Sequence, residues 1–170
     1  VRFADIVIGT ELERRGVETG LPLWSANALL MSPGTLRQIH DDYIRAGADI
    51  ITTATFRTTR RTFLRAGLPD RSMELTAFAV GLTHQSRAAF PDHEVLIAGC
   101  IGPLEDCYRP DLVPPDAELR DEHAEHALRL AHAGVDFLFL ETIGSIREAH
   151  AAAPAGLRRC ARSTVPPDRT

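Results

Sequence analysis

Four short apolar runs, separated by stretches of helical periodicity, constrain the fold of this chain more than any other feature. The runs are FADIVI (3–8), ADIITTATF (48–56), EVLIAGCIG (94–102) and VDFLFLET (135–142). They are rich in Ile, Val, Leu and Phe without strict alternation of apolar and polar residues, which is typical of strands buried on both faces of a parallel sheet. We therefore expect four parallel strands.

Amphipathic helices are predicted between these strands. Residues 32–47 offer Ser32 as an N-cap, Pro33 at the first helical position and Gly47 as a stop signal. Similar patterns cover residues 69–90 and 114–134. Strands that alternate with helices through connections of this length are the right-handed crossovers of a parallel α/β fold.

A repeated βα pattern narrows the choice of α/β fold. AGADIITT and AGVDFLFLET both place Ala-Gly and an Asp at the start of an apolar strand, as repeated units of a (β/α)8 barrel or a doubly wound sheet do. No dinucleotide-binding or P-loop glycine motif follows any strand, so the sequence favours the barrel.

A complete barrel of this type needs about 250 residues. We therefore expect a truncated (β/α)8 TIM barrel with about the first four βα units over residues 1–153. Pro154 and Gly156 interrupt the last helical pattern. Residues 154–170 are expected to form an irregular, disordered tail.

Composition and charge exclude several classes of partner. The net charge is -4, and basic and acidic residues are interspersed, so the chain offers no basic stripe for nucleic acid and no polybasic membrane patch. No apolar run approaches the roughly 18–20 residues of a membrane span, and the N-terminus shows no signal-type pattern. We expect a cytoplasmic protein that binds neither nucleic acid nor membranes.

The reactive residues of parallel barrels lie at the carboxyl ends of the strands. Glu141 is the strongest candidate, because a carboxylate closing FLFLE could bind an ammonium group or transfer a proton; capping of the next helix or pairing with an Arg is the structural alternative. Asp5 lies inside the first strand, where burial requires a partner: a ligand or a backbone hydrogen bond. Further candidates by position are Gly9, Thr10, Glu11, Thr52, Thr53, Thr55, Cys100 and Thr142.

Histidines and cysteines give weak metal-site patterns. DEHAEHALRLAH and HDDY bring His and acidic residues within helical reach of one another, but neither is a zinc-binding H-E-x-x-H motif, and we interpret both as solvated helix faces. Cys100, Cys107 and Cys160 could supply three thiolates to zinc. Only Cys100 lies at a predicted strand end, so we interpret all three as reduced, buried or incidental thiols.

Five ordered motifs resemble the homocysteine S-methyltransferase family. They are GTELERRG, LWSANALL, IHDDYIRAGADIITTATFRTT, AGCIGP and AGVDFLFLETIGSIREA, and the likeness covers roughly residues 3–153. The resemblance implies a zinc-containing (β/α)8 barrel that transfers a methyl group from a sulfonium-type or related donor to the thiol of homocysteine, giving methionine. Zinc would deprotonate the thiol and so make it a nucleophile.

The resemblance also implies residue roles. Asp5 and Thr10 match the family's first-strand motif D-G-G-x-G-T, and Glu141 matches its fourth-strand Glu-Thr, so all three are expected to bind homocysteine. Ile6 and Val7 stand where the motif has two glycines. The family's zinc cysteines belong to the second half of the barrel and have no match here, so we assign no catalytic residue and no metal ligand.

Two interpretations of function follow. The first is an S-methyltransferase of this family, impaired unless the other half of the barrel is supplied; the alternative is a non-catalytic half barrel that acts as an oligomerising or binding module. In either case, unpaired edges on the first and fourth strands would favour self-association. An unrelated (β/α) enzyme with Glu141 as its base is disfavoured by the five motifs.

Overall fold

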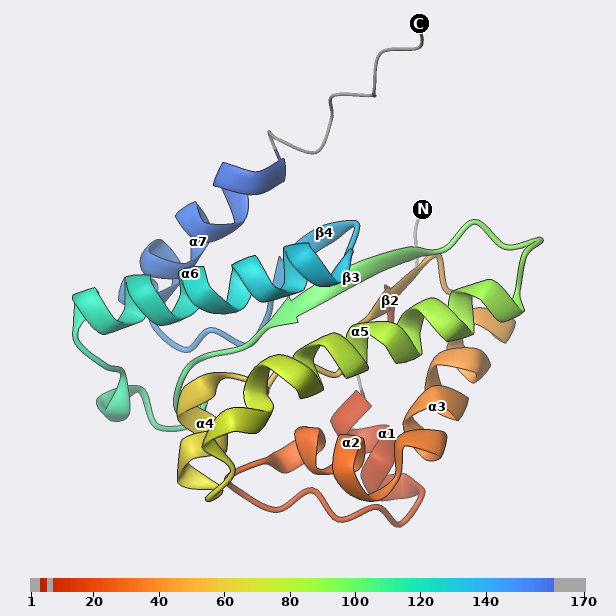
Figure 1. The fold of residues 1–170 in the computed structure, drawn as a ribbon, viewed down its shortest axis with the longest axis horizontal. Coiled ribbons are helices and arrows are strands. Elements are labelled where there is room, and N and C mark those ends of the chain that lie inside the picture. The colour runs from red at the N-terminus through yellow and green to blue at the C-terminus, as the bar shows by residue number, and fades with distance from the viewer. Residues whose placement is uncertain (1–3, 6–7, 161–170) are drawn as a thin grey trace, which may run out of the picture.

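Four parallel strands form one sheet whose spatial order follows the chain (Figure 1). The computed structural model describes residues 4–5 and 8–160, with the backbone alone for Asp5 and residues 154–160. The strands are β1 (Ala4–Asp5), β2 (Ile50–Thr52), β3 (Leu96–Ile101) and β4 (Phe137–Leu140). Each lies within one of the four apolar runs, so the predicted parallel α/β sheet is confirmed.

Long helices connect consecutive strands. Pairing of Ile51 with Ile97 and of Ala98 with Phe137 fixes the parallel registers, and parallel neighbours require a crossover between them. The crossover helices are α3 (Pro33–Arg45), α5 (Ser72–Ala89) and α6 (Asp116–Ala133), which confirm the three predicted segments. In Figure 1, α5 and α6 pass in front of the sheet.

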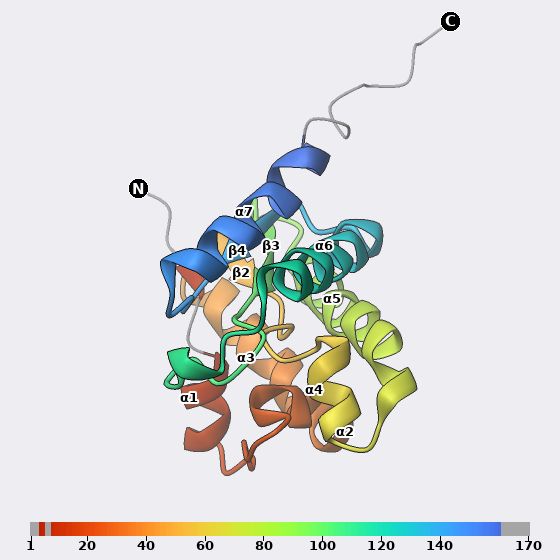
Figure 2. The same cartoon turned by 90° about the vertical axis from the view of Figure 1, so that its left-hand side faces the viewer.

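Shorter elements surround the strand ends. They are α1 (Ile8–Arg14), α2 (Asn27–Met31), α4 (Arg60–Arg65) and the 3-10 turns η1 (Trp24–Ala26), η2 (Pro69–Arg71) and η3 (Pro110–Leu112). Figure 2 shows α1, α2 and α4 together at one end of the molecule, away from α7 (Ile146–Cys160).

The first apolar run does not remain a strand as far as predicted. Ile8 begins α1, so Gly9 and Thr10 lie in a helix and not in a loop. The reason is helical spacing: Ile8 and Leu12 are one turn apart, and both are buried in the largest apolar cluster with residues such as Leu36 and Phe63.

The C-terminal segment also differs from the prediction. Helix α7 continues to Cys160, past Pro154 and Gly156, where irregular chain was expected. Its earlier turns bury Glu148 and Ala152, and tertiary packing of this kind overrides local propensity. The predicted tail beyond Cys160 lies outside the described residues, and a domain boundary at residue 154 remains a prediction.

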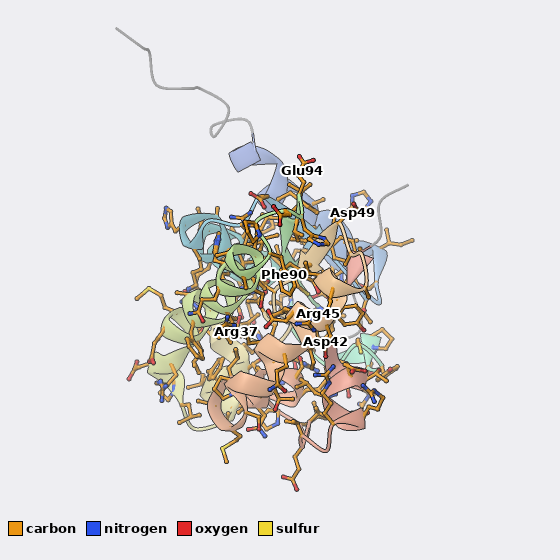
Figure 3. The ribbon with its side chains drawn as sticks, turned by 90° about the vertical axis from the view of Figure 1, so that its right-hand side faces the viewer. Arg37, Asp42, Arg45, Asp49, Phe90 and Glu94 are labelled. Atoms are coloured by element: carbon orange, nitrogen blue, oxygen red, sulfur yellow. The ribbon has the colours of Figure 1, made fainter. Side chains whose placement is uncertain are left out.

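The carboxyl end of α3 packs against Phe90, which caps the end of α5. The Arg45 guanidinium lies over the Phe90 ring, 5.3 Å from its centroid, and donates to Asp42 Oδ1 at 2.6 Å. Figure 3 shows these three residues on one side of the molecule. An exposed cation over an aromatic face contributes about 0.5–1 kcal/mol.

His40 of HDDY and His123 and His126 of DEHAEHALRLAH are buried, so the interpretation as solvated helix faces is wrong for these three, whereas His132 is exposed as expected. His40, His123 and His126 are at most 2% exposed. Within α6 the two histidines share an inward stripe with Leu119 and Leu130, because these positions recur at helical spacing.

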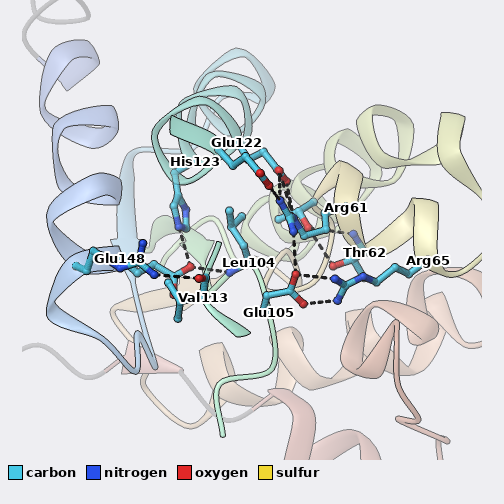
Figure 4. Close-up of polar contacts among 12 residues, drawn as sticks. Arg61, Thr62, Arg65, Leu104, Glu105, Val113, Glu122, His123 and Glu148 are labelled. Carbon is cyan, nitrogen blue, oxygen red and sulfur yellow. Dashed lines mark hydrogen bonds and ion pairs between the residues drawn. The ribbon is translucent and has the colours of Figure 1, made fainter. Parts of the chain in front are cut away.

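Each of the two buried α6 histidines makes a hydrogen bond through its Nε2 atom. His123 Nε2 lies 3.1 Å from Glu148 Oε1, which also accepts the Leu104 N–H at 2.8 Å (Figure 4). His126 Nε2 donates to the Thr55 carbonyl at 3.2 Å. These contacts join α6 to α7 and to the chain that follows β2.

None of the helices in the described part of the chain has the length and apolar character needed to cross a membrane.

Candidate functional site

The carboxyl ends of β2 and β4 and the first helical turns enclose a pocket of about 110 Å³. Two sequence-predicted binding residues, Thr10 of α1 and Glu141 after β4, line it together. The backbone of Asp5 ends β1 at the same end of the sheet, paired with Ile51. The full lining is Ile8, Gly9, Thr10, Trp24, Ser25, Thr52, Thr53, Ala54, Phe56, Glu141 and Thr142.

One other predicted position, Glu11, lies elsewhere. Glu11 does not line the pocket; it accepts hydrogen bonds from Arg14 and Arg15 on the outer side of α1. The Arg14 hydrogen bond lowers the pKa of Glu11 to about 2. Ile6 and Val7 lie outside the described residues.

Hydroxyl groups of the Thr-rich segment after β2 hold β3 in place behind the pocket. The Cys100 N–H donates to Thr53 Oγ1 at 3.0 Å, and Thr55 Oγ1 donates to the Cys100 carbonyl at 2.7 Å. Thr53 Oγ1 and Thr55 Oγ1 are 2.7 Å apart. Because the Thr55 proton is used on the carbonyl, Thr53 must donate to Thr55.

Cys100 links this framework to Glu141. The Cys100 thiol is buried and donates to Glu141 Oε1, with 2.9 Å between sulfur and oxygen. The Glu141 N–H donates to the Ile101 carbonyl at 3.1 Å. Residues of β3 therefore hold Glu141 in place. Its carboxylate lines the pocket, where it could bind a cationic group.

Two aromatic rings, which sequence reasoning did not select, form one wall. Trp24 and Phe56 pack edge to face with centroids 5.3 Å apart. A Cβ at Gly102 would lie 2.5 Å from the Phe56 ring, so only glycine permits this packing. Both aromatic residues lie inside motifs that carry the family resemblance, and their presence in those motifs is the sequence signal that could have identified them as site residues.

Backbone strain is concentrated at this pocket. Trp24 (φ 47°) and Thr142 (φ 57°) are the two non-glycine residues of the described chain with positive φ, and both line the pocket. Such conformations cost on the order of 1–3 kcal/mol each and gather at ligand sites. The strain is independent support for a functional site here.

Comparison with known proteins decides the family. The sequence model of the homocysteine S-methyltransferase family matches residues 5–165. The chain belongs to the homocysteine S-methyltransferase family. The predicted resemblance is thereby confirmed.

Relatives of known name agree with this family. Homocysteine S-methyltransferase from Escherichia coli (strain K12) is 34% identical over 90% of this chain and 53% of its own length. Selenocysteine methyltransferase from Astragalus bisulcatus is 34% identical over 86% of this chain and 51% of its own length. The chain therefore spans about half the length of the curated relatives it matches.

Solved structures of the family share the fold. The crystal structure of the homocysteine methyltransferase MmuM from Escherichia coli in its oxidized form superposes with a TM-score of 0.83 at 30% identity, covering 94% of this chain and 59% of that one. The metallated form gives a TM-score of 0.78 at 31% identity, with coverage of 91% and 57%.

A second pocket, of about 420 Å³, adjoins the first and shares Thr10 and Trp24 with it. Arg57 lines this second pocket and is 6% exposed, and its buried Nε atom has no hydrogen-bond partner within the described part of the chain. Burial lowers the pKa of Arg57, whereas Cys107 and Asp106 act in the opposite direction.

Zinc, which the family resemblance implies, finds no binding group in the residues that the structure describes. No three His, Cys, Asp or Glu side chains among them are grouped to hold a metal ion. Cys100 is directed to Glu141, and His123 and His126 are hydrogen-bonded in the core. Cys107 is a half-buried free thiol, and the side chain of Cys160 is not described.

Proposed function

We propose that this chain is the amino-terminal half of a (β/α)8 methyltransferase barrel and that it binds the amino acid part of homocysteine. The observation that carries the proposal is the convergence of Thr10 and Glu141, from opposite ends of the described chain, on one pocket at the carboxyl ends of the strands. This is where parallel barrels place their reactive groups.

The chemistry of the pocket suits an amino acid. The Glu141 carboxylate would accept hydrogen bonds from the ammonium group, and the Thr10 hydroxyl can donate to the ligand carboxylate. Asp5, at the end of β1, is proposed as a second acidic group of the same site. The rings of Trp24 and Phe56 would pack against the methylene carbons and exclude water.

The proposed reaction is methyl transfer to the homocysteine sulfur. The sulfur lone pair attacks the methyl carbon of a sulfonium-type or related donor, the bond from that methyl group to the donor atom breaks with its electron pair going to the donor, and the thiol proton is released. Zinc, when bound, supplies activation of the thiol. Since the described residues hold no metal group, the role proposed for this chain ends at holding and orienting homocysteine.

Calorimetric titration with homocysteine under reducing conditions tests this proposal. We expect the wild-type chain to bind and Glu141→Gln to bind about tenfold or more weakly, because a charge-assisted hydrogen bond is lost. Glu118→Gln, on the exposed side of α6, is the matched control and should bind like the wild type.

Equal affinities for wild type and Glu141→Gln would contradict the proposed role of Glu141. A chain that binds no homocysteine but forms stable oligomers in sedimentation would instead favour the half-barrel binding module.

A further inference from the structure

We propose that Cys100 is a positioning residue for Glu141: its thiol fixes the carboxylate that receives the ammonium group of homocysteine. The inference rests on the proposed function, since it assigns Cys100 a role through Glu141. It concerns a buried thiol, 1% exposed, that the proposed chemistry leaves unused. Cys100 itself does not line the pocket.

Cys100 is held rigidly by the neighbouring strand. Its N–H is bound by Thr53 Oγ1 and its carbonyl by Thr55 Oγ1, at 3.0 Å and 2.7 Å. All three residues are almost fully buried. The side chain of Cys100 therefore leaves the backbone from a fixed point, which is what a positioning group requires.

The thiol reaches Glu141 from the adjacent strand. Cys100 pairs with Phe139 in the β3–β4 ladder, and Glu141 continues β4 with its N–H on the Ile101 carbonyl. Sulfur and Oε1 are 2.9 Å apart. One side-chain contact and one backbone contact thus orient Glu141 relative to the same strand.

A thiol suits this task chemically. It donates one hydrogen bond to the carboxylate without adding a positive charge, so it does not compete electrostatically with an incoming ammonium group. A long, flexible Glu side chain that is ordered before the ligand arrives loses less conformational freedom on binding. The expected contribution of Cys100 is therefore to affinity for the amino group.

Two variants and two ligands test the proposal. Cys100→Ala removes the donor, whereas Cys100→Ser keeps a donor of similar size. We expect Cys100→Ala to bind homocysteine about tenfold more weakly than the wild type and Cys100→Ser to remain within about threefold. Cys107→Ser is the matched thiol control and should bind like the wild type.

The second ligand separates positioning from general structural damage. 4-Mercaptobutyrate is homocysteine without its amino group, so its binding does not use the proposed Glu141 contact. Cys100→Ala should leave the affinity for 4-mercaptobutyrate unchanged. Equal weakening for both ligands, or a Cys100→Ser variant as weak as Cys100→Ala, would overturn the proposal.

A double-mutant cycle and a vibrational measurement complete the test. In a Glu141→Ala background, Cys100→Ala should cause no further loss of homocysteine affinity. In a chain with Cys107 and Cys160 changed to Ser, Glu141→Ala should shift the S–H Raman band of Cys100 toward that of a thiol without a hydrogen bond.

The Raman measurement needs no ligand, so the two proposals can fail separately. An unmoved S–H band would show that the thiol contact does not exist, and would overturn the role of Cys100 while leaving homocysteine binding to be judged by calorimetry. A wild-type chain that shows the band shift but binds no homocysteine would overturn the proposed function, and with it the role of Cys100 in binding.

Discussion

At the scale of single residues, burial decides the charge of His126. The side chain is 2% exposed, its Nε2 donates to the Thr55 carbonyl, and its Nδ1 has no hydrogen-bond partner. Burial lowers the pKa of His126 from 6.5 to about 4, and the nearby His123 acts in the same direction. The neutral ring is therefore the folded form near neutral pH.

This lowered pKa predicts acid sensitivity. Between pH 6.5 and about 4, the unfolded chain binds a proton at His126 that the folded chain does not, so the free energy of unfolding falls as the pH falls through this range. The loss from this residue is about 3 kcal/mol at most. Above pH 6.5 the residue should add no pH dependence.

Urea unfolding across this pH range measures the effect. His126→Gln retains an N–H donor but does not titrate, and its unfolding free energy should fall less steeply between pH 6.5 and 4 than that of the wild type. His150→Gln, at an exposed position of α7, should keep the wild-type slope. Identical slopes for His126→Gln and wild type would refute the assignment.

At the scale of elements, one arginine joins three segments. Arg61 of α4 donates to Glu105 after β3 and to Glu122 of α6 (Figure 4). It also donates to Glu118 of α6. Glu105 is 3% exposed and is also paired with Arg65. The Glu122 hydrogen bond leads the interactions that raise the pKa of Arg61. The network fixes α4, which follows the pocket-lining segment after β2.

Removing the buried member of this network should cost more than removing an exposed one. We expect Glu105→Ala to lower the free energy of unfolding by about 2–3 kcal/mol, because two guanidinium groups lose a charged partner. Glu118→Ala, half-exposed in the wild type, should cost less than about 1 kcal/mol. Denaturant unfolding of both variants provides the comparison, and equal costs would contradict it.

At the scale of the whole molecule, the sheet ends in an edge strand. Within the described residues β4 pairs with β3 alone, and its four residues are all partly exposed. An edge of this kind presents backbone donors and acceptors to a second chain. Self-association through this edge is therefore expected.

Sedimentation velocity tests whether the chain self-associates through the exposed edge of β4. We expect the sedimentation coefficient of the wild type to rise with protein concentration. Phe139→Lys should reduce that rise, because a charged side chain on an edge strand opposes pairing with another copy. A coefficient independent of concentration would contradict the expectation.

The four strands and three crossover helices could be predicted because each is a continuous run or period in the sequence. Helix α1 could not, because Ile8 continues the apolar run of the first strand and only the spacing to Leu12 shows its helical role. The burial of histidines on α3 and α6 was missed because histidine counts as polar in a pattern, whereas in the fold His126 is buried with a hydrogen bond from its Nε2 to the Thr55 carbonyl.

The site was predictable only in part. Thr10 and Glu141 follow predicted strands, so their convergence could be anticipated from the topology. Trp24 and Phe56 could not be placed, because their approach depends on the path of η1 relative to β2. The link from Cys100 to Glu141 depends on strand register, which the sequence does not show.

Gly102 couples two positions that lie far apart in the sequence. The Phe56 ring occupies the space that a Cβ at residue 102 would need, so a side chain at residue 102 requires a smaller residue at position 56. Among related proteins, a side chain at the position of Gly102 should be accompanied by a smaller residue at the position of Phe56. The shape of the pocket wall thus depends on both residues, and an alignment of the family should show the two positions covarying.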